Sequence, residues 1–142
     1  MAKIASLACI IICMVLLHGD DCHGAQRGNL EVEARTAYDL QDRDGLSNKS
    51  DPYMEVIAID DGGNSVRKTS STIQGNYNPL WFEKMDFGQD TWKKIKVRVW
   101  DNDLNPDDAL SDQITFDVVL GSKWLSIDCY GGGKAYFIYT FK

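Results

Sequence analysis

The chain has 142 residues and a formal net charge of −6. This length suits one domain with a single hydrophobic core. An acidic chain is a poor partner for phosphates, so the composition argues against nucleic-acid binding as the main function.

The N-terminal residues have the pattern of a secretory signal peptide. Lys3 provides a short positive start, and residues 4–17 are apolar with one exception. This apolar run is too short to span a bilayer, but it has the length of a signal-peptide core. We expect cleavage after Gly19, with Gly24 or Ala25 as alternatives, and a secreted product with no later membrane span.

Removal of residues 1–19 takes away one cation and two of the four cysteines, so the formal net charge becomes −7. Cys22 and Cys129 remain, an even number in an oxidising compartment. We predict a single disulfide that ties the N-terminal segment, residues 20–28, to a late strand. Cleavage after Gly24 would leave Cys129 without its partner, which favours the earlier cleavage site.

The rest of the chain alternates between short apolar–polar runs and turn residues, and no stretch keeps a helical period. We predict strands at residues 29–35, 52–59, 66–73, 80–87, 95–101, 113–119, 124–129 and 134–141. Eight short strands with a turn about every ten residues predict an all-β domain, an antiparallel β-sandwich over residues 29–142. Its loops should emerge in two groups, one at each end.

Some apolar residues are expected in the core. In the second strand these are Tyr53, Val56, Ile57 and Ile59. The four tryptophans, Trp81, Trp92, Trp100 and Trp124, are expected to pack in the core and on the sheets rather than to form a ligand site.

An acidic loop follows the fifth predicted strand. Asp101, Asp103, Asp107 and Asp108 place four carboxylates within eight residues, and Asn and Pro among them end the strand. Carboxylates this close repel one another unless a cation lies between them, and Ca²⁺ takes six to eight oxygen ligands. The alternative is an ordinary solvated loop, because Asp and Asn are common loop residues.

The same loop has an EF-hand-like spacing. Asp101, Asp103, Asn105 and Asp112 fall at the first, third, fifth and twelfth positions of such a loop. However, Pro106 occupies the glycine position and the flanking segments are strands, so we reject an EF-hand.

Three motifs occur in order along the chain: Ser-Asp-Pro-Tyr at residues 50–53, Asn-Pro-Leu-Trp at 78–81 and Val-Trp-Asp-Asn-Asp at 99–103. In this order and spacing they resemble the C2 domain family. The resemblance covers residues 29–142 and implies an eight-stranded C2 sandwich with the type II strand order. It also implies a binding module without catalytic activity.

Within the family, the chain is most similar to the C2 domain at the C-terminus of perforins. This similarity rests on residues 26–28, 83–88 and 107–108. We expect no pore-forming domain, because a signal peptide precedes the C2 domain here.

The resemblance implies a Ca²⁺ site built by two loops. Its ligands map onto Asp44, Asp51, Asp101, Asp103 and Asp108, with Asp42 and Asp107 as additional candidates. Asp44 matches only if the first loop is one residue longer than usual, and Asp108 replaces an acid that would align with Ala109. Extracellular sites of this kind bind Ca²⁺ at roughly 10⁻⁴ to 10⁻³ M.

The resemblance further implies calcium-dependent binding to phospholipid membranes. The apolar tips expected to contact the membrane are Leu46, Tyr77 and Leu104. Five basic residues, Arg67, Lys68, Lys93, Lys94 and Lys96, either face anionic headgroups or form a solvated strand face. Asn48 begins a glycosylation sequon, and a glycan there would argue against deep membrane insertion.

Two other functions compete with calcium-dependent lipid binding. A calcium-stabilised extracellular module that binds protein and not lipid is the non-enzymatic alternative. A secreted hydrolase is disfavoured, because His23 is the only histidine left after processing and lies in the N-terminal segment. We expect a monomer.

Overall fold

The computed structural model describes residues 25–41, 50–102 and 107–142. This part of the chain is built almost wholly of strands, as predicted. The elements are β1 (Gly28–Tyr38), β2 (Pro52–Asp60), β3 (Ser65–Thr69), β4 (Leu80–Asp90), β5 (Trp92–Asp101), β6 (Asp108–Ala109), β7 (Ile114–Asp117), β8 (Gly121–Asp128), the 3₁₀ turn η1 (Tyr130–Gly132) and β9 (Lys134–Phe141).

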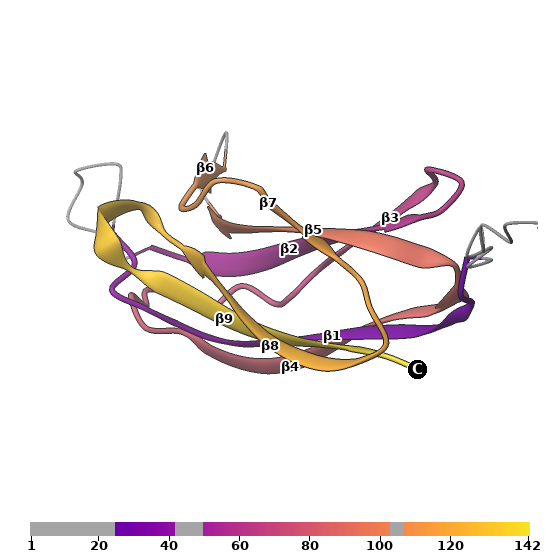
Figure 1. Ribbon diagram of the computed structural model, residues 1–142. Helices are drawn as coiled ribbons and strands as arrows, with labels where there is room; N and C mark the ends of the chain where they lie inside the picture. The colour runs from indigo at the N-terminus through magenta and orange to yellow at the C-terminus, as the bar shows by residue number, and fades with distance from the viewer. Residues whose placement is uncertain (1–24, 42–49, 103–106) are drawn as a thin grey trace, which may run out of the picture.

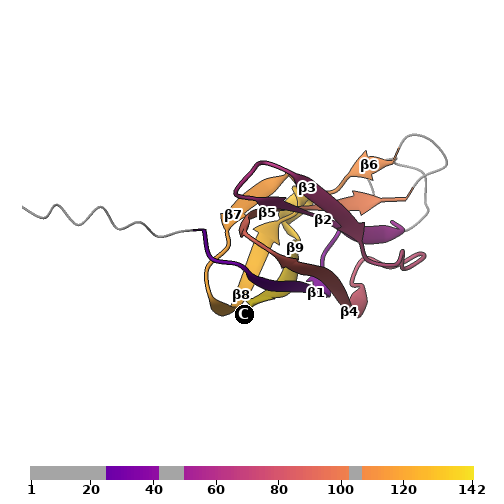
Figure 2. The same ribbon diagram turned by 90° about the vertical axis from the view of Figure 1, so that its right-hand side faces the viewer.

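The strands form two antiparallel sheets that pack face to face (Figure 1). One sheet has the order β4-β1-β9-β8. The other has the order β3-β2-β5-β6, and β7 also pairs with β5. The two-layer arrangement is a β-sandwich, and it is clear in the perpendicular view as well (Figure 2). Among the described residues, no helix is long and apolar enough to cross a membrane.

The core lies between the sheets and follows the two-residue period of a strand. In β5, Ile95, Val97 and Val99 are fully buried, as the alternation predicts. In β2, Met54, Val56 and Ala58 are fully buried, as is Pro52 at the start of the strand.

Tyr53, Ile57 and Ile59 are half-buried on the outer face of β2, so the predicted core was wrong at these three positions. The reason is that neighbouring residues of a strand face opposite sides. Ile57 and Val56 therefore cannot both face the core, and the strand places the smaller Ala58 inside.

Trp124 also departs from expectation. Trp81 and Trp92 are buried and Trp100 is half-buried, but Trp124 is 63% exposed on β8. Its ring centroid lies 5.1 Å from the Arg35 guanidinium, which also lies 4.5 Å from the ring centroid of Phe82. The cation–π contact with Arg35 thus stabilises the Trp124 ring on the surface, outside the core.

The described residues hold nine strand segments where the sequence predicted eight strands. β6 and β7 are two short segments that both pair with β5, and Ser111 lies between them. The Ser111 hydroxyl accepts the Val99 N–H at 3.0 Å, so a side chain replaces a backbone partner and divides the strand. Ser70 ends β3 early in the same way by accepting the Met54 N–H at 2.9 Å.

Two acidic loops are predicted at residues 42–51 and 101–108, and one described end of each lies at the same end of the sandwich. Pro52, which follows Asp51, is the register partner of Asp101. Asp101 is in turn the register partner of Asp108. β1 ends at Tyr38, shortly before the first acidic loop in the sequence.

Candidate metal centre

Asp51 connects three segments at this end of the sandwich. Its backbone N–H donates to Asp101 Oδ1 at 2.6 Å, and its backbone oxygen accepts the Asn102 N–H at 3.0 Å. Its own Oδ1 accepts the Gly75 N–H at 2.6 Å. These bonds fix the Asp51 carboxylate close to the end of β5 while leaving Oδ2 without a hydrogen bond to any described residue.

Asp101 continues the inward row of β5 beyond Val99. The side chain is only 3% exposed, so its carboxylate lies at the end of the core. Burial of an ionised carboxylate is costly unless hydrogen bonds or a cation compensate it. The Asp51 N–H supplies one such bond.

Asp108 joins this pair through the β5–β6 ladder. Residues directly opposite in an antiparallel ladder point to the same face, with Cβ atoms about 4.5–5.5 Å apart. Because Asp108 is opposite Asp101, its side chain lies on the Asp101 side of the sheet. This register supports Asp108 as the residue that replaces the acid missing at Ala109.

Asp107 points the other way. The Tyr53 hydroxyl, on the outer face of β2, donates to Asp107 Oδ2 at 2.7 Å. Burial of the phenol together with this bond raises the pKa of Tyr53 to about 12. Asp107 is therefore held against the outer face, and it is a weaker ligand candidate than Asp108.

Of the predicted ligands, the structure brings Asp51, Asp101 and Asp108 to one end of the sandwich. Asp44, Asp103 and the additional candidate Asp42 lie outside the described residues. Within residues 25–41, 50–102 and 107–142, no three His, Cys, Asp or Glu side chains form a group that could hold a metal ion. The donors present are all oxygen, which fits Ca²⁺ and not a softer metal.

The predicted membrane contacts are placed only in part. Tyr77 is half-buried, and Leu46 and Leu104 lie outside the described residues, as does the Asn48 sequon. Among the basic residues, Arg67 forms an ion pair with Glu55, and Lys93 Nζ lies 3.1 Å from Asp61 Oδ1. These pairs favour the solvated-face interpretation of the basic cluster.

Cys129 has a buried thiol next to the η1 turn. It is free of any disulfide with the described residues, and burial raises its pKa to about 11. Its predicted partner Cys22 lies outside the described residues, so the predicted disulfide is not tested directly.

Sequence reasoning missed Gly75 and Tyr53. Gly75 contributes a backbone N–H to the Asp51 carboxylate, and Tyr53 orients Asp107. Tyr53 lies in the Ser-Asp-Pro-Tyr motif, but its partner is 54 positions away and only the β2–β5–β6 register brings them together. Gly75 carried no signal beyond that of a turn residue.

Comparison with known proteins identifies the family of the chain. The C2 domain family matches residues 28–128. Human perforin-1 is 32% identical over 108 residues, which are 69% of this chain and 18% of perforin-1. The eye isozyme of protein kinase C from Drosophila melanogaster is 36% identical over 78 residues, 53% of this chain and 11% of the kinase. The chain thus spans less than a fifth of the length of either relative.

Solved structures show the same fold. A structure of a C2 domain superposes with a TM-score of 0.68 at 20% identity and covers 81% of this chain and 98% of that domain. The calcium-bound C2A and C2B domains of extended synaptotagmin 2 match with a TM-score of 0.64 at 26% identity, over 80% of this chain and 45% of theirs. The sandwich, its motifs and the family match agree: the chain belongs to the C2 domain family.

Proposed function

We propose that this protein is a secreted module that binds Ca²⁺ and, through Ca²⁺, phospholipid surfaces. The observation that carries the proposal is the position of Asp51, Asp101 and Asp108 at the same end of a C2 sandwich. The calcium-bound structure of extended synaptotagmin 2 supports the choice of ion. Secretion rests on the signal-peptide pattern of residues 1–19, and lipid binding rests on the family resemblance.

Asp51, Asp101 and Asp108 would hold the ion together with Asp44 and Asp103 from the two acidic loops. The hydrogen bonds around Asp51 fix two of these carboxylates before any ion arrives. Without a cation, the acids repel anionic lipid. Bound Ca²⁺ reverses the local field and offers coordination positions to lipid phosphate oxygens.

Liposome sedimentation with and without Ca²⁺ tests the proposal. The protein should pellet with mixed anionic and zwitterionic liposomes only when Ca²⁺ is present. The double variant Asp101→Asn with Asp103→Asn should stay in the supernatant while keeping its β-sheet circular dichroism, because it loses two ligand charges.

The matched control removes two acids at the other end of the sandwich. The double variant Asp61→Asn with Asp117→Asn should pellet like the unchanged protein, since both residues are exposed and distant from Asp101. Calcium-dependent pelleting that survives in the Asp101/Asp103 variant would refute the site assignment.

The rival function, protein binding without lipid binding, is favoured by one observation. Phe82 and Trp124 are 55% and 63% exposed on the outer face of the β4-β1-β9-β8 sheet, which a membrane at the acidic end would not cover. Calcium binding without any sedimentation on liposomes would select this rival.

A further inference from the structure

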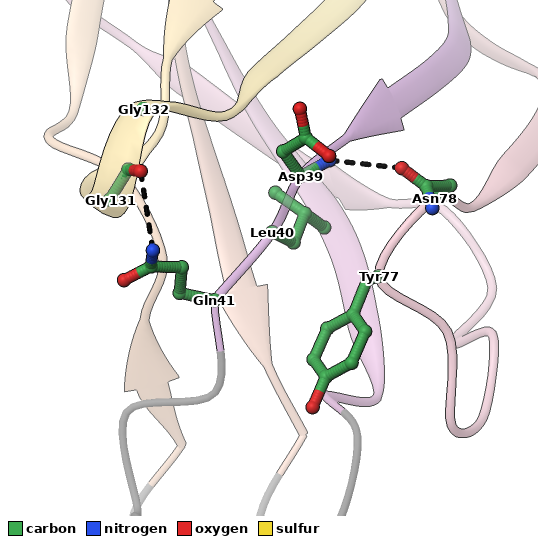
Figure 3. Close-up of a pocket in the computed structure, with 7 residues that line it drawn as sticks. All are labelled: Asp39, Leu40, Gln41, Tyr77, Asn78, Gly131 and Gly132. Atoms are coloured by element: carbon green, nitrogen blue, oxygen red, sulfur yellow. Dashed lines mark hydrogen bonds between the residues drawn. The ribbon is translucent and has the colours of Figure 1, made fainter.

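A depression of about 640 Å³ lies at the acidic end of the sandwich, in addition to the candidate metal centre. Three segments line it, namely residues 39–41, residues 77–78 and the glycines of η1 (Figure 3). Sites for small molecules commonly have volumes of about 300–1,000 Å³. This depression is therefore large enough for a ligand of one or a few rings.

Hydrogen bonds between the three segments fix the walls. The Asp39 N–H donates to Asn78 Oδ1 at 2.9 Å, and the Leu40 N–H donates to the Tyr77 carbonyl at 3.1 Å. On the opposite wall, Gln41 Nε2 donates to the Gly131 carbonyl at 3.3 Å (Figure 3). The site is thus preorganised, which lowers the cost of binding.

The turn at residues 130–133 can approach residues 38–41 this closely because it contains glycines. Gly131 has a φ of +79°, and a Cβ there would overlap the Gln41 side chain. A Cβ on Gly133 would come within 2.6 Å of the Tyr38 carbonyl oxygen. The close approach of the turn to residues 38–41 therefore requires glycine at both positions.

The polar groups of the walls keep unused hydrogen-bonding capacity. Among the described residues, the Asp39 carboxylate, the Asn78 Nδ2, the Gln41 Oε1 and the Tyr77 hydroxyl have no hydrogen-bond partner. Leu40, which is 2% exposed, and the Tyr77 ring add apolar surface. The set therefore combines acceptors, donors and an aromatic wall.

The charge of the walls selects the class of ligand. Among the described residues that line the depression there is no Lys, Arg or His, and Asp39 contributes a carboxylate. A phosphate or sulfate would be repelled there. A neutral sugar suits the walls, because each hydroxyl both donates and accepts and the C–H face of the ring packs on an aromatic side chain.

We propose that this depression, the Asp39–Tyr77 site, binds a neutral sugar residue without the help of Ca²⁺. Carboxylate and amide groups take the sugar hydroxyls, and the Tyr77 ring packs against the ring face. Tyr77 is also a predicted membrane contact, but the sugar site needs no Ca²⁺, so chelation distinguishes the two functions.

Amide-detected NMR of the isotope-labelled protein tests the site directly. The protein is produced in bacteria, so that Asn48 carries no glycan, and is kept in EDTA. It is titrated with methyl α-mannopyranoside, methyl β-galactopyranoside and N-acetylglucosamine up to millimolar concentrations. At least one sugar should shift the side-chain amide resonances of Gln41 and Asn78 in a saturable way.

Three variants test whether the sugar binds at the Asp39–Tyr77 site. Asp39→Asn should weaken binding by about tenfold, because a hydrogen bond to a charged carboxylate is stronger than one to a neutral amide. It should still fold, since Asn tolerates the φ of +53° at this position. Tyr77→Ala should abolish the shifts, and Trp124→Ala, which removes a more exposed ring elsewhere, should preserve them.

The proposal is overturned if no sugar produces saturable shifts, or if the shifts depend on Trp124 and not on Tyr77. It is also overturned if phosphocholine, tested in parallel, produces Tyr77-dependent shifts and the sugars do not. That outcome would assign the depression to a lipid headgroup.

Discussion

Two serine side chains take the place of backbone partners at the same level of the β2–β5 ladder. Ser70 accepts the Met54 N–H and Ser111 accepts the Val99 N–H, and Met54 and Val99 are register partners. Each hydroxyl also donates to the carbonyl of the following residue. The strands that flank the β2–β5 pair therefore depart from regular backbone pairing just before the acidic end.

Ser111→Ala tests this role. Ser111 is fully buried, so the variant leaves the Val99 N–H without its acceptor. We expect the free energy of unfolding, measured by chemical denaturation, to fall by about 1–3 kcal/mol. Ser126→Ala on the exposed part of β8 is the control and should change little. Equal stability of the two variants would contradict the account.

The position of Asp51 and Asp101 at one end of the sandwich could be predicted from the sequence, whereas their hydrogen-bond partners could not. Both residues stand in short motifs that resemble those of the C2 family, which matches residues 28–128. Ser111, Tyr53 and Gly75 act through residues far away in the chain. Their roles depend on sheet register, which single positions do not reveal.

At the scale of elements, β6 decides which acid faces the candidate metal centre. It has only two residues, yet its register puts Asp108 opposite Asp101 and leaves Asp107 to Tyr53. The sequence predicts both acids as ligand candidates, because the register of this segment, and therefore the direction of each side chain, is not known from the sequence.

Asp107→Asn and Asp108→Asn form a matched pair with the same change of charge on adjacent residues. We expect Asp108→Asn to weaken Ca²⁺ binding by about tenfold or more, since ligand charge sets the affinity of such sites. Asp107→Asn should have a much smaller effect on Ca²⁺ affinity. Calorimetric titration of both variants measures the difference, and a stronger effect of Asp107→Asn would refute the assignment by register.

Strand alternation predicted most elements, because apolar and polar residues alternate clearly in β1, β5 and β9. It was less successful in β2, where apolar residues occupy both faces. In β3 the β-branched residues predicted a longer strand, but the regular pairing ends before Ser70. The outer face of β2 is half-covered rather than solvated, so residue type alone cannot assign its faces.

At the scale of the whole molecule, the length of the sandwich bears on the predicted disulfide. Cys129 lies level with Tyr38, through the pairing of Asp128 with Lys134 and of Lys134 with Tyr38. Ala25 lies at the opposite end, beside Trp92. β1 spans about 33 Å between these ends, whereas the three residues from Cys22 to Ala25 reach at most about 11 Å.

This geometry argues against a bridge between Cys22 and Cys129 within one folded chain. We expect peptide mapping without reduction to find no Cys22–Cys129 peptide, and Cys129 to resist alkylation until the protein is unfolded, because its thiol is buried. Recovery of the bridged peptide from native protein would show that the N-terminal segment follows a different path.

The membership in the C2 family and the two-layer fold could be derived from motifs and alternation, because both are properties of the chain at short range. The proposed calcium dependence would be a property of the whole acidic end, because its expected ligands come from two loops. It is therefore the central claim to measure.

Calorimetric titration of the protein with Ca²⁺, alone and with mixed anionic and zwitterionic liposomes, tests this claim most directly. We predict calcium binding whose affinity tightens when liposomes are present, because the ion and the lipid phosphates share one site. Affinity that is indifferent to lipid would contradict membrane coupling and favour a protein partner. The absence of calcium binding would contradict the account as a whole.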